Sequence, residues 1–299
     1  MSRLENRYRG LLRVLPGWYR SEREEEMVGL FLADRDDDLD LEHGLPGWGE
    51  TGATLALAVR TRFAASGAPA RAVAAGDVVR LVALLGVLVQ SAYAVQGLLS
   101  SLLPEGEGLV PPAVALEVAP LVGALALVAG YRGVAKSLFV VVSLVSLARL
   151  GQAFGPEVPL RVSWQVPLWL ATLALLAGFH RDATAPVRVR SRWALAAAVS
   201  GTAAVTLVIH PIGLYATVFP ALVPAAVVVT GLAHLARRGS AVGSLALAVW
   251  IAAMLPAELL SLTHSGLGRV LTVAMTVVGT ALLVAGTRGL RRPRLTVTP

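Results

Sequence analysis

Residues 81–103 of the chain read LVALLGVLVQSAYAVQGLLSSLL, which is 23 consecutive positions without a charged side chain. A helix needs about 20 mostly apolar residues to cross the roughly 30 Å of hydrocarbon in a bilayer. This stretch therefore predicts a transmembrane helix, and seven further apolar stretches predict the same. The long uncharged run from Trp193 to Ala236 is divided in two by its Pro211–Pro224 region. The eight expected spans are residues 81–103, 113–130, 138–155, 164–179, two within 193–236, 241–262 and 267–286.

The composition of the whole chain agrees with an all-α polytopic membrane protein. Hydrophobic residues make up 56% of it and charged residues 15%, with a mean hydropathy of +0.68, against roughly 45–50% and about 25% in soluble domains. A soluble globular protein and a disordered chain are both excluded, because disordered chains are poor in apolar residues. The absence of cysteine from the sequence excludes disulfides and thiolate chemistry.

Enzyme motifs are missing from the sequence. The single lysine, Lys136, follows an alanine and not the glycine of a phosphate-binding loop, which argues against ATP hydrolysis. Neither an HExxH metal motif nor a GxSxG nucleophile motif occurs. We therefore expect a non-enzymatic protein without a cofactor or a bound metal.

Charges in the loops between the expected spans predict the topology. One set of loops carries twelve Arg and Lys residues, whereas the opposite set carries only Arg161 and Arg269. Positive residues are retained on the cytoplasmic side, and the N-terminus has no apolar run of signal-peptide length. We expect a multi-pass protein of the cytoplasmic (plasma) membrane with both termini in the cytoplasm.

The region before the first span differs from the rest in charge and pattern. Residues 1–77 have a net charge of −3 and residues 78–299 a net charge of +10. We expect a cytoplasmic helical domain at 1–65, a linker at 66–77, an eight-helix transmembrane domain at 78–287 and a basic cytoplasmic tail at 288–299. The acidic domain lacks the basic face that binds phosphates, so direct contact with nucleic acid is not expected.

Three short helices are expected in the N-terminal domain. The first should end at Pro16-Gly17, and the second should start at a capping box formed by Ser21 and Glu24. The third should bury one stripe at four-residue spacing. This stripe consists of Leu55, Val59 and Phe63.

This small domain either caps the membrane helices or docks a partner protein. Aromatic residues, Arg and Met are enriched at protein interfaces, which selects five candidates for partner contact. They are Tyr8, Trp18, Tyr19, Arg20 and Met27. The same side chains could equally form the core of the domain.

Four ionisable residues fall within the expected spans or at their outer ends. Glu117, Arg149, His210 and Glu258 all lie in the half of the bilayer away from the cytoplasm. Such residues are costly in lipid and are functional candidates by default. One hypothesis is an outward-facing polar pocket in which Arg149 pairs with Glu117 or Glu258 and accepts an anionic group or transmits a signal. The alternative is a structural ion pair, or side chains that snorkel to the headgroups.

The N-terminal stretch at residues 4–32 reads LENRYRGLLRVLPGWYRSEREEEMVGLFL. It resembles the N-terminal module of a group of bacterial integral membrane proteins, and it is similar, more loosely, to the HAAS-type cytoplasmic domain found beside PadR-like transcriptional regulators. The residues that carry the resemblance are Leu4, Glu5, Tyr8, Leu11, Leu12, Leu15, Pro16, Tyr19, Arg20, Glu22, Arg23, Glu25, Glu26 and Met27.

The resemblance implies a regulatory membrane protein whose cytoplasmic head engages a transcription factor. The expected partners are therefore the lipid bilayer and a cytoplasmic transcription regulator or sigma factor. The other function that the sequence leaves open is that of a transporter or permease-like subunit for a small or lipidic solute.

Overall fold

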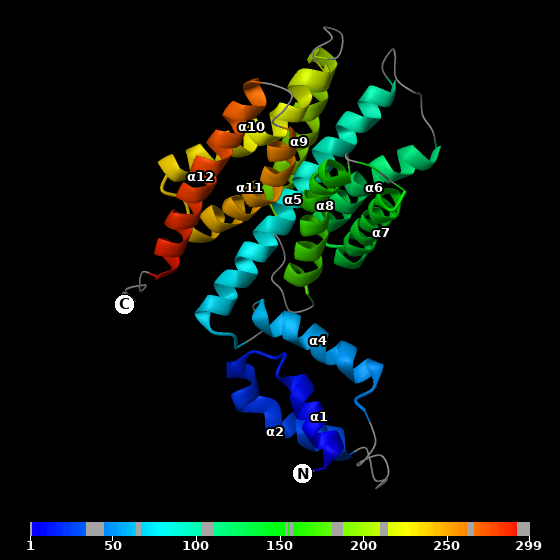
Figure 1. The fold of residues 1–299 in the computed structure, drawn as a ribbon, viewed down its shortest axis with the longest axis vertical. Helices are drawn as coiled ribbons and strands as arrows, with labels where there is room; N and C mark the ends of the chain where they lie inside the picture. The colour runs from blue at the N-terminus through cyan, green and yellow to red at the C-terminus, as the bar shows by residue number, and fades with distance from the viewer. Residues whose placement is uncertain are drawn as a thin grey trace. The chain divides into compact units, whose positions relative to one another are not determined.

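The computed structural model describes residues 2–33, 45–63, 67–102, 111–152, 155, 158–180, 188–209, 215–261 and 266–291, and every regular element in these ranges is an α-helix (Figure 1). The chain divides into two compact units. The N-terminal unit contains the described residues up to Asp77 together with His180, and the main unit contains the remaining described residues from Val78 onward.

Three helices build most of the N-terminal unit, namely α1 (Arg3–Leu12), α2 (Gly17–Ala33) and α4 (Trp48–Arg62). The hydroxyl of Ser2 caps α1 by accepting the backbone N–H of Glu5 across 3.1 Å. Helix α2 begins directly after Pro16, whose carbonyl accepts the N–H of Tyr19 and of Arg20. The expected capping box at Ser21 is therefore wrong, because Ser21 already lies inside α2 and its hydroxyl donates to the carbonyl of Trp18.

The core of the N-terminal unit is built from large side chains of α1 and α2 and small ones of α4. The rings of Tyr8 and Phe31 stack with centroids 3.9 Å apart and planes within 2°. The core residues are Leu4, Tyr8, Leu12, Leu15, Val28, Phe31 and Ala58.

Helix α4 turns a different stripe inward from the one expected. Its buried residues are Thr54, Ala58 and Thr61, whereas Leu55 is 47% exposed. The prediction is off by one position because it selected the largest apolar side chains. Small residues of α4 lie against the bulky side chains of α1, Leu57 of α4 packs at the side of this core, and Thr54 also bonds the Tyr8 side chain.

The main unit is made of α5–α12, and two of these eight helices in the described chain, α6 and α11, lie within two residues of an expected span at both ends. Their bounds are α5 (Ala70–Leu102), α6 (Pro111–Ala129), α7 (Arg132–Leu150), α8 (Val158–Gly178), α9 (Arg188–Ile209), α10 (Tyr215–Ala236), α11 (Ala241–Ser261) and α12 (Gly266–Arg291). Since α5 begins at Ala70, most of the segment expected as a linker at 66–77 is helical. Its first two turns precede the main unit.

Five of these helices are long and apolar enough to cross a membrane by length and composition, counted over the described residues. They are α5, α7, α8, α11 and α12. The described parts of α6, α9 and α10 contain shorter apolar segments, at Val114–Ala129, Trp193–Val208 and Leu222–Ala236. The all-helical fold with several such helices fits a multi-pass membrane protein.

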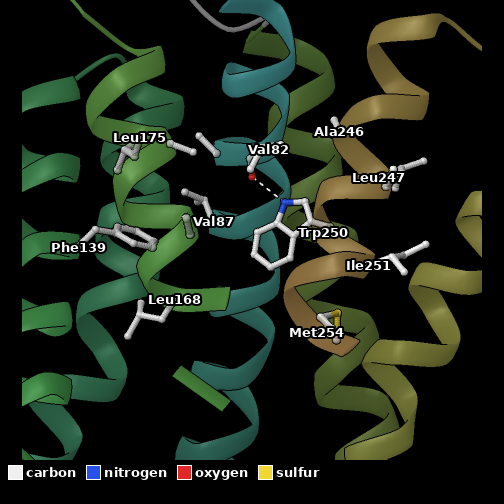
Figure 2. Packing of buried hydrophobic residues seen from close by; sticks show 14 of the residues in the cluster. Val82, Val87, Phe139, Leu168, Leu175, Ala246, Leu247, Trp250, Ile251 and Met254 are labelled. Carbon is white, nitrogen blue, oxygen red and sulfur yellow. Dashed lines mark hydrogen bonds between the residues drawn. The ribbon is translucent and has the colours of Figure 1, made fainter. Parts of the chain in front are cut away.

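A tryptophan on α11 holds the centre of the main unit together (Figure 2). Trp250 is almost fully buried, and its indole N–H donates to the carbonyl of Val82 on α5 across 2.8 Å. Gly86, one turn further along α5, lies against this indole and against Ala171 of α8. A Cβ atom at Gly86 would lie 2.7 Å from the indole ring. The absence of a side chain at Gly86 therefore lets α5, α8 and α11 approach closely.

Neighbouring helices of the main unit run antiparallel. Lys136 at the start of α7 donates to the carbonyl of Leu176 near the end of α8 across 3.4 Å. Gly289 at the end of α12 lies against Ala241 at the start of α11. The basic start of α7 thus lies beside the end of α8, and the basic end of α12 lies beside the start of α11.

Two contacts link these helix pairs to α5. Gly178 at the end of α8 lies against Arg80, and Trp250 in the first half of α11 bonds Val82. The residues of α5 around Arg80, the beginnings of α7 and α11, and the ends of α8 and α12 therefore lie at one end of the main unit.

Candidate functional site

A cavity of about 520 Å³ opens among α6, α7 and α8. Its polar lining comes from Glu117 of α6, Ser146 and Arg149 of α7, and Arg161 and Gln165 of α8. Its apolar lining consists of Leu116, Val142, Val145, Leu150, Trp164 and Leu168. The cavity is therefore amphipathic, with charged groups on part of its wall and hydrocarbon on the rest.

Helix geometry explains why these polar side chains meet. Ser146 and Arg149 are three residues apart on α7, and Arg161 and Gln165 are four apart on α8, so each pair shares one helix face. The hydroxyl of Ser146 donates to Oε1 of Gln165 across 2.7 Å and ties the two faces together.

Glu117 enters the cavity because α5 has a glycine beside it. A Cβ atom at Gly97 would lie 2.7 Å from the Glu117 carboxylate. The carboxylate therefore packs against α5 while its helix face lines the cavity. Glu117 is half-buried, whereas Arg149 and Arg161 are exposed. The carboxylate thus sits against the helices, and the guanidinium groups lie at the rim.

The charges of this cavity favour an anion. Two guanidinium groups and one carboxylate leave a formal excess of one positive charge. The Glu117 carboxylate lies within the electrostatic reach of Arg149. Guanidinium groups bind carboxylates and phosphates through two parallel N–H···O bonds. The arrangement can hold an anionic group at the rim.

The structure brings together two of the four predicted intramembrane residues. Glu117 and Arg149 line the same cavity. Glu258 lies elsewhere, buried in α11, where its charge acts on Tyr93 of α5. His210 is outside the described residues. Arg149 thus shares a cavity with Glu117 and not with Glu258, and no salt bridge within 4.0 Å joins these described residues.

Sequence reasoning missed Ser146, Arg161 and Gln165 as members of this site. The sequence predicts Arg161 only as a loop charge, because this residue lies just before the expected span at 164–179. The signal that could have found these residues is the pairing of a polar residue and an arginine on one helix face, which occurs on both α7 and α8.

The five predicted partner-contact residues have different environments in the N-terminal unit. Tyr8 is 6% exposed and belongs to the core, so its side chain is inaccessible to a partner. Tyr19 and Met27 are half-buried and pack against this core. Trp18 meets Tyr19 edge to face, with ring centroids 5.6 Å apart, and Arg20 is half-buried. The core hypothesis therefore holds for Tyr8, and the other four keep some accessible surface.

Apolar residues outside that set are more exposed. Trp48, the first residue of α4, is 93% exposed, and Leu55 projects from the same side of the helix seven residues later. Leu30 of α2 is 69% exposed. Single exposed apolar residues are ordinary, but Trp48 is the most exposed large apolar side chain among the described residues.

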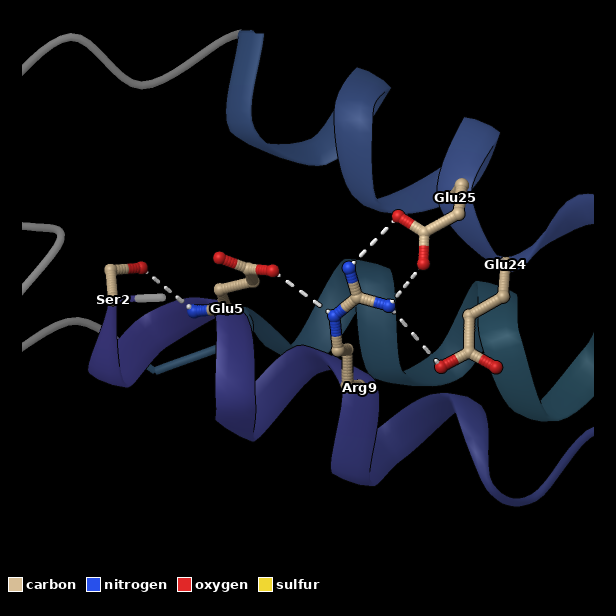
Figure 3. A network of polar contacts seen from close by, with 5 residues as sticks. All are labelled: Ser2, Glu5, Arg9, Glu24 and Glu25. Carbon is tan, nitrogen blue, oxygen red and sulfur yellow. Dashed lines mark hydrogen bonds and ion pairs between the residues drawn. The ribbon is translucent and has the colours of Figure 1, made fainter.

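A cluster of charges joins α1 to α2 (Figure 3). The guanidinium of Arg9 contacts Glu5 at 3.1 Å, Glu25 at 2.7 Å and Glu24 at 3.6 Å. The hydrogen bonds from Arg9 lower the pKa of Glu25 below its ordinary value. Because Glu25 is exposed and the other three side chains are only half-buried, solvent screens these contacts and the cluster contributes little to stability.

The pKa of Tyr8 is raised, whereas that of Glu25 is lowered. Burial, and then the negative charge of Glu50, raise the pKa of Tyr8, and the hydrogen bond to Thr54 opposes this rise. The phenol therefore stays neutral in the core of the N-terminal unit.

Over the residues that the structure describes, no group of three or more His, Asp or Glu side chains is placed to hold a metal ion. Comparisons of the chain with protein-family models, with curated proteins and with solved structures find no significant match. The resemblance of residues 4–32 to a HAAS-type module stays a prediction.

Proposed function

We propose that this chain is an eight-span protein of the cytoplasmic membrane that acts, without catalysis, as a regulator through a partner protein bound by its N-terminal unit. Both termini lie in the cytoplasm in this proposal. The observation that carries it is the indole of Trp48, which is 93% exposed on a small helical unit whose core is formed by other residues.

The topology part of the proposal is supported by the basic helix ends. Arg80 of α5, Arg132 and Lys136 at the start of α7, and Arg288 and Arg291 at the end of α12 all lie at one end of the main unit. Positive residues at a common end are the signature of the cytoplasmic side.

The chemistry of the N-terminal unit suggests the partner. Trp48 and Leu55 offer an apolar face on α4, which an apolar groove of a partner can receive by the helix-in-groove mode. Residues 1–77 carry a net charge of −3, so a partner with a basic rim is favoured. A cytoplasmic transcription regulator or sigma factor, which the resemblance of residues 4–32 implies, is such a candidate.

The test is co-purification of the full-length protein from its native envelope in mild detergent. Trp48→Ser should reduce recovery of a specific partner at least about tenfold, because buried tryptophans at interfaces are frequent hot spots of 2 kcal/mol or more. The matched control is Ala56→Ser, at another exposed position of α4. An unchanged partner list for Trp48→Ser would contradict the proposal.

A transporter or permease-like subunit is the second candidate function. Two observations favour it: the amphipathic cavity among α6, α7 and α8, and an apolar cavity of about 420 Å³ among α5, α9, α10 and α11. The test is flux of labelled small and lipidic solutes in proteoliposomes. Saturable flux that Arg149→Gln abolishes would favour this function over partner-based regulation.

A further inference from the structure

We propose that the cavity among α6, α7 and α8 binds the phosphate group of an anionic phospholipid. The inference does not depend on partner binding by the N-terminal unit, because every residue that carries it belongs to the main unit. The ligand chemistry is a phosphate ester, and the membrane supplies it at high local concentration.

The position of the two arginines matches the level of lipid headgroups. Arg149 lies in the last turn of α7, and Arg161 lies three residues after the start of α8. At a rise of 1.5 Å per residue, both are within about 5 Å of their helix ends. Guanidinium groups at this depth meet the headgroup region of a bilayer.

The wall of the cavity becomes apolar deeper in the helices. Val142 precedes Arg149 by seven residues and Leu168 follows Arg161 by seven, which places both about 10 Å further in. A ligand that fills the cavity therefore needs a charged group at the rim and hydrocarbon below it. A phospholipid has this build, whereas a freely soluble anion satisfies only the rim.

The remaining polar and aromatic groups suit the same ligand. Gln165 accepts from Ser146 through Oε1, so its amide nitrogen provides donors for phosphate oxygens. Trp164 lies beside these groups in the lining, and tryptophan favours the boundary between headgroups and hydrocarbon. Both neighbours thus assist binding at the headgroup level.

The effect of removing Glu117 distinguishes phospholipid binding from a purely structural role of this site. Its carboxylate attracts the Arg149 guanidinium and therefore competes with a phosphate for it. Removing this carboxylate should strengthen phospholipid binding. A purely structural role of the two charges predicts the opposite, because loss of Glu117 would leave Arg149 without compensation and weaken the unit.

The experiment uses the full-length protein, stripped of lipid in detergent and titrated with phosphatidylglycerol or phosphatidylcholine while bound lipids are counted by native mass spectrometry. The wild type should bind one phosphatidylglycerol about tenfold more tightly than phosphatidylcholine, as expected for charge-assisted hydrogen bonds. Arg149→Gln and Arg161→Gln should each remove most of this preference, and Glu117→Gln should increase it.

The matched control is Arg269→Gln, which removes an exposed arginine from the first turn of α12, outside this cavity. Equal losses in Arg269→Gln and Arg149→Gln would overturn the site, since any exposed arginine would then serve. Arg149→Lys separates folding from binding: it keeps the charge but lacks the planar fork, so the folded variant should lose part of the preference. Full retention of the preference in Arg149→Lys and Arg149→Gln would also overturn the site.

A second arm distinguishes the source of the phosphate. Inorganic phosphate is added at millimolar concentration to the protein loaded with phosphatidylglycerol. Retention of the lipid supports the phospholipid site. Complete displacement of the lipid, with the same dependence on Arg149, would assign the cavity to a soluble phosphate and overturn the lipid proposal.

Discussion

The N-terminal unit and the main unit both bury large apolar side chains, but they differ in the residues that they expose and in those that lie where helices meet. The interior of the N-terminal unit contains leucines and two stacked aromatic rings, and charged residues cover much of its surface. In the main unit, large aliphatic residues such as Leu173 and Val273 are 64% exposed. Small residues lie where its helices meet, as Gly86 does against Ala171.

This difference fits an N-terminal unit surrounded by water and a main unit surrounded by lipid. In water, burial of large apolar side chains stabilises a fold. In lipid, hydrocarbon outside the helices is as apolar as leucine, so helices associate through close packing of small residues and through hydrogen bonds. The N-terminal unit should therefore be most sensitive to lost side-chain volume, and the main unit should be sensitive to added volume.

The largest expected effect tests the first half of this comparison. Phe31→Ala removes the ring stacked on Tyr8 and should lower the free energy of unfolding of the N-terminal unit by about 3–5 kcal/mol. Hydrogen exchange of the full-length protein in detergent should then rise in α1 and α2 and stay unchanged in α11 and α12. The control is Leu30→Ala at the neighbouring exposed position. Equal exchange in the two variants would mean that the N-terminal unit has no core of this kind.

The second effect tests sensitivity to added volume in the main unit. Gly86→Ala places a Cβ atom against Ala171 and the Trp250 ring, and should destabilise the unit by about 1–3 kcal/mol. Thermal unfolding in detergent measures this loss. Gly201→Ala in α9 is the control, because a Cβ atom there meets nothing within 4 Å. If the Gly86→Ala protein were as stable as the wild type, close approach of the helices at Gly86 would not be what stabilises the main unit.

A smaller effect concerns the hydrogen bond between α7 and α8. The hydroxyls of Ser143 and Thr172 lie 2.8 Å apart, and Ser143→Ala should cost about 0.6 kcal/mol, the average for such bonds between membrane helices. Thr172 keeps its bond to the carbonyl of Leu168. Ser200→Ala, which removes a bond within one helix, should have less effect on thermal unfolding. The reverse order would argue against hydrogen bonding as a link between helices.

The smallest effect is the pH dependence of the N-terminal unit. Arg9 lowers the pKa of Glu25 in the folded state below its ordinary value of 4.5, so the unfolded state binds this proton more readily. The resulting stability is present above pH 4.5 and is lost as the pH falls through the lower, folded-state pKa. Glu25→Gln should flatten this part of the acid unfolding curve, followed by hydrogen exchange of α1 and α2.

The comparison case for this prediction is Glu22→Gln. Glu22 is an exposed residue of the same helix, and it is not part of the Arg9 cluster in Figure 3. Its substitution should leave the acid unfolding curve of α1 and α2 as it is in the wild type. Identical curves for Glu22→Gln and Glu25→Gln would assign the pH dependence to general charge and not to the contact with Arg9.

Particular residues show where sequence reasoning ended for the candidate site. Glu117 and Arg149 could be selected because a charge inside an apolar stretch is conspicuous by itself. That Glu117, and not Glu258, shares a cavity with Arg149 depended on which helices pack together. Arg161 and Gln165 carried no such signal, since polar residues near a helix end are ordinary until the opposing helix is known.

The sequence by itself determined that the chain is helical and apolar, in which stretches the apolar helices lie, and which regions differ in charge. These properties are local, because uncharged runs, prolines and charge clusters act on their own segments. The tertiary structure alone decided which stripe of α4 is buried, that Gly86 receives the Trp250 ring, and that three helices combine their polar faces into one cavity. Those properties depend on the size and shape of side chains far away in the sequence. The hydrophobic periodicity of a single helix therefore does not predict them.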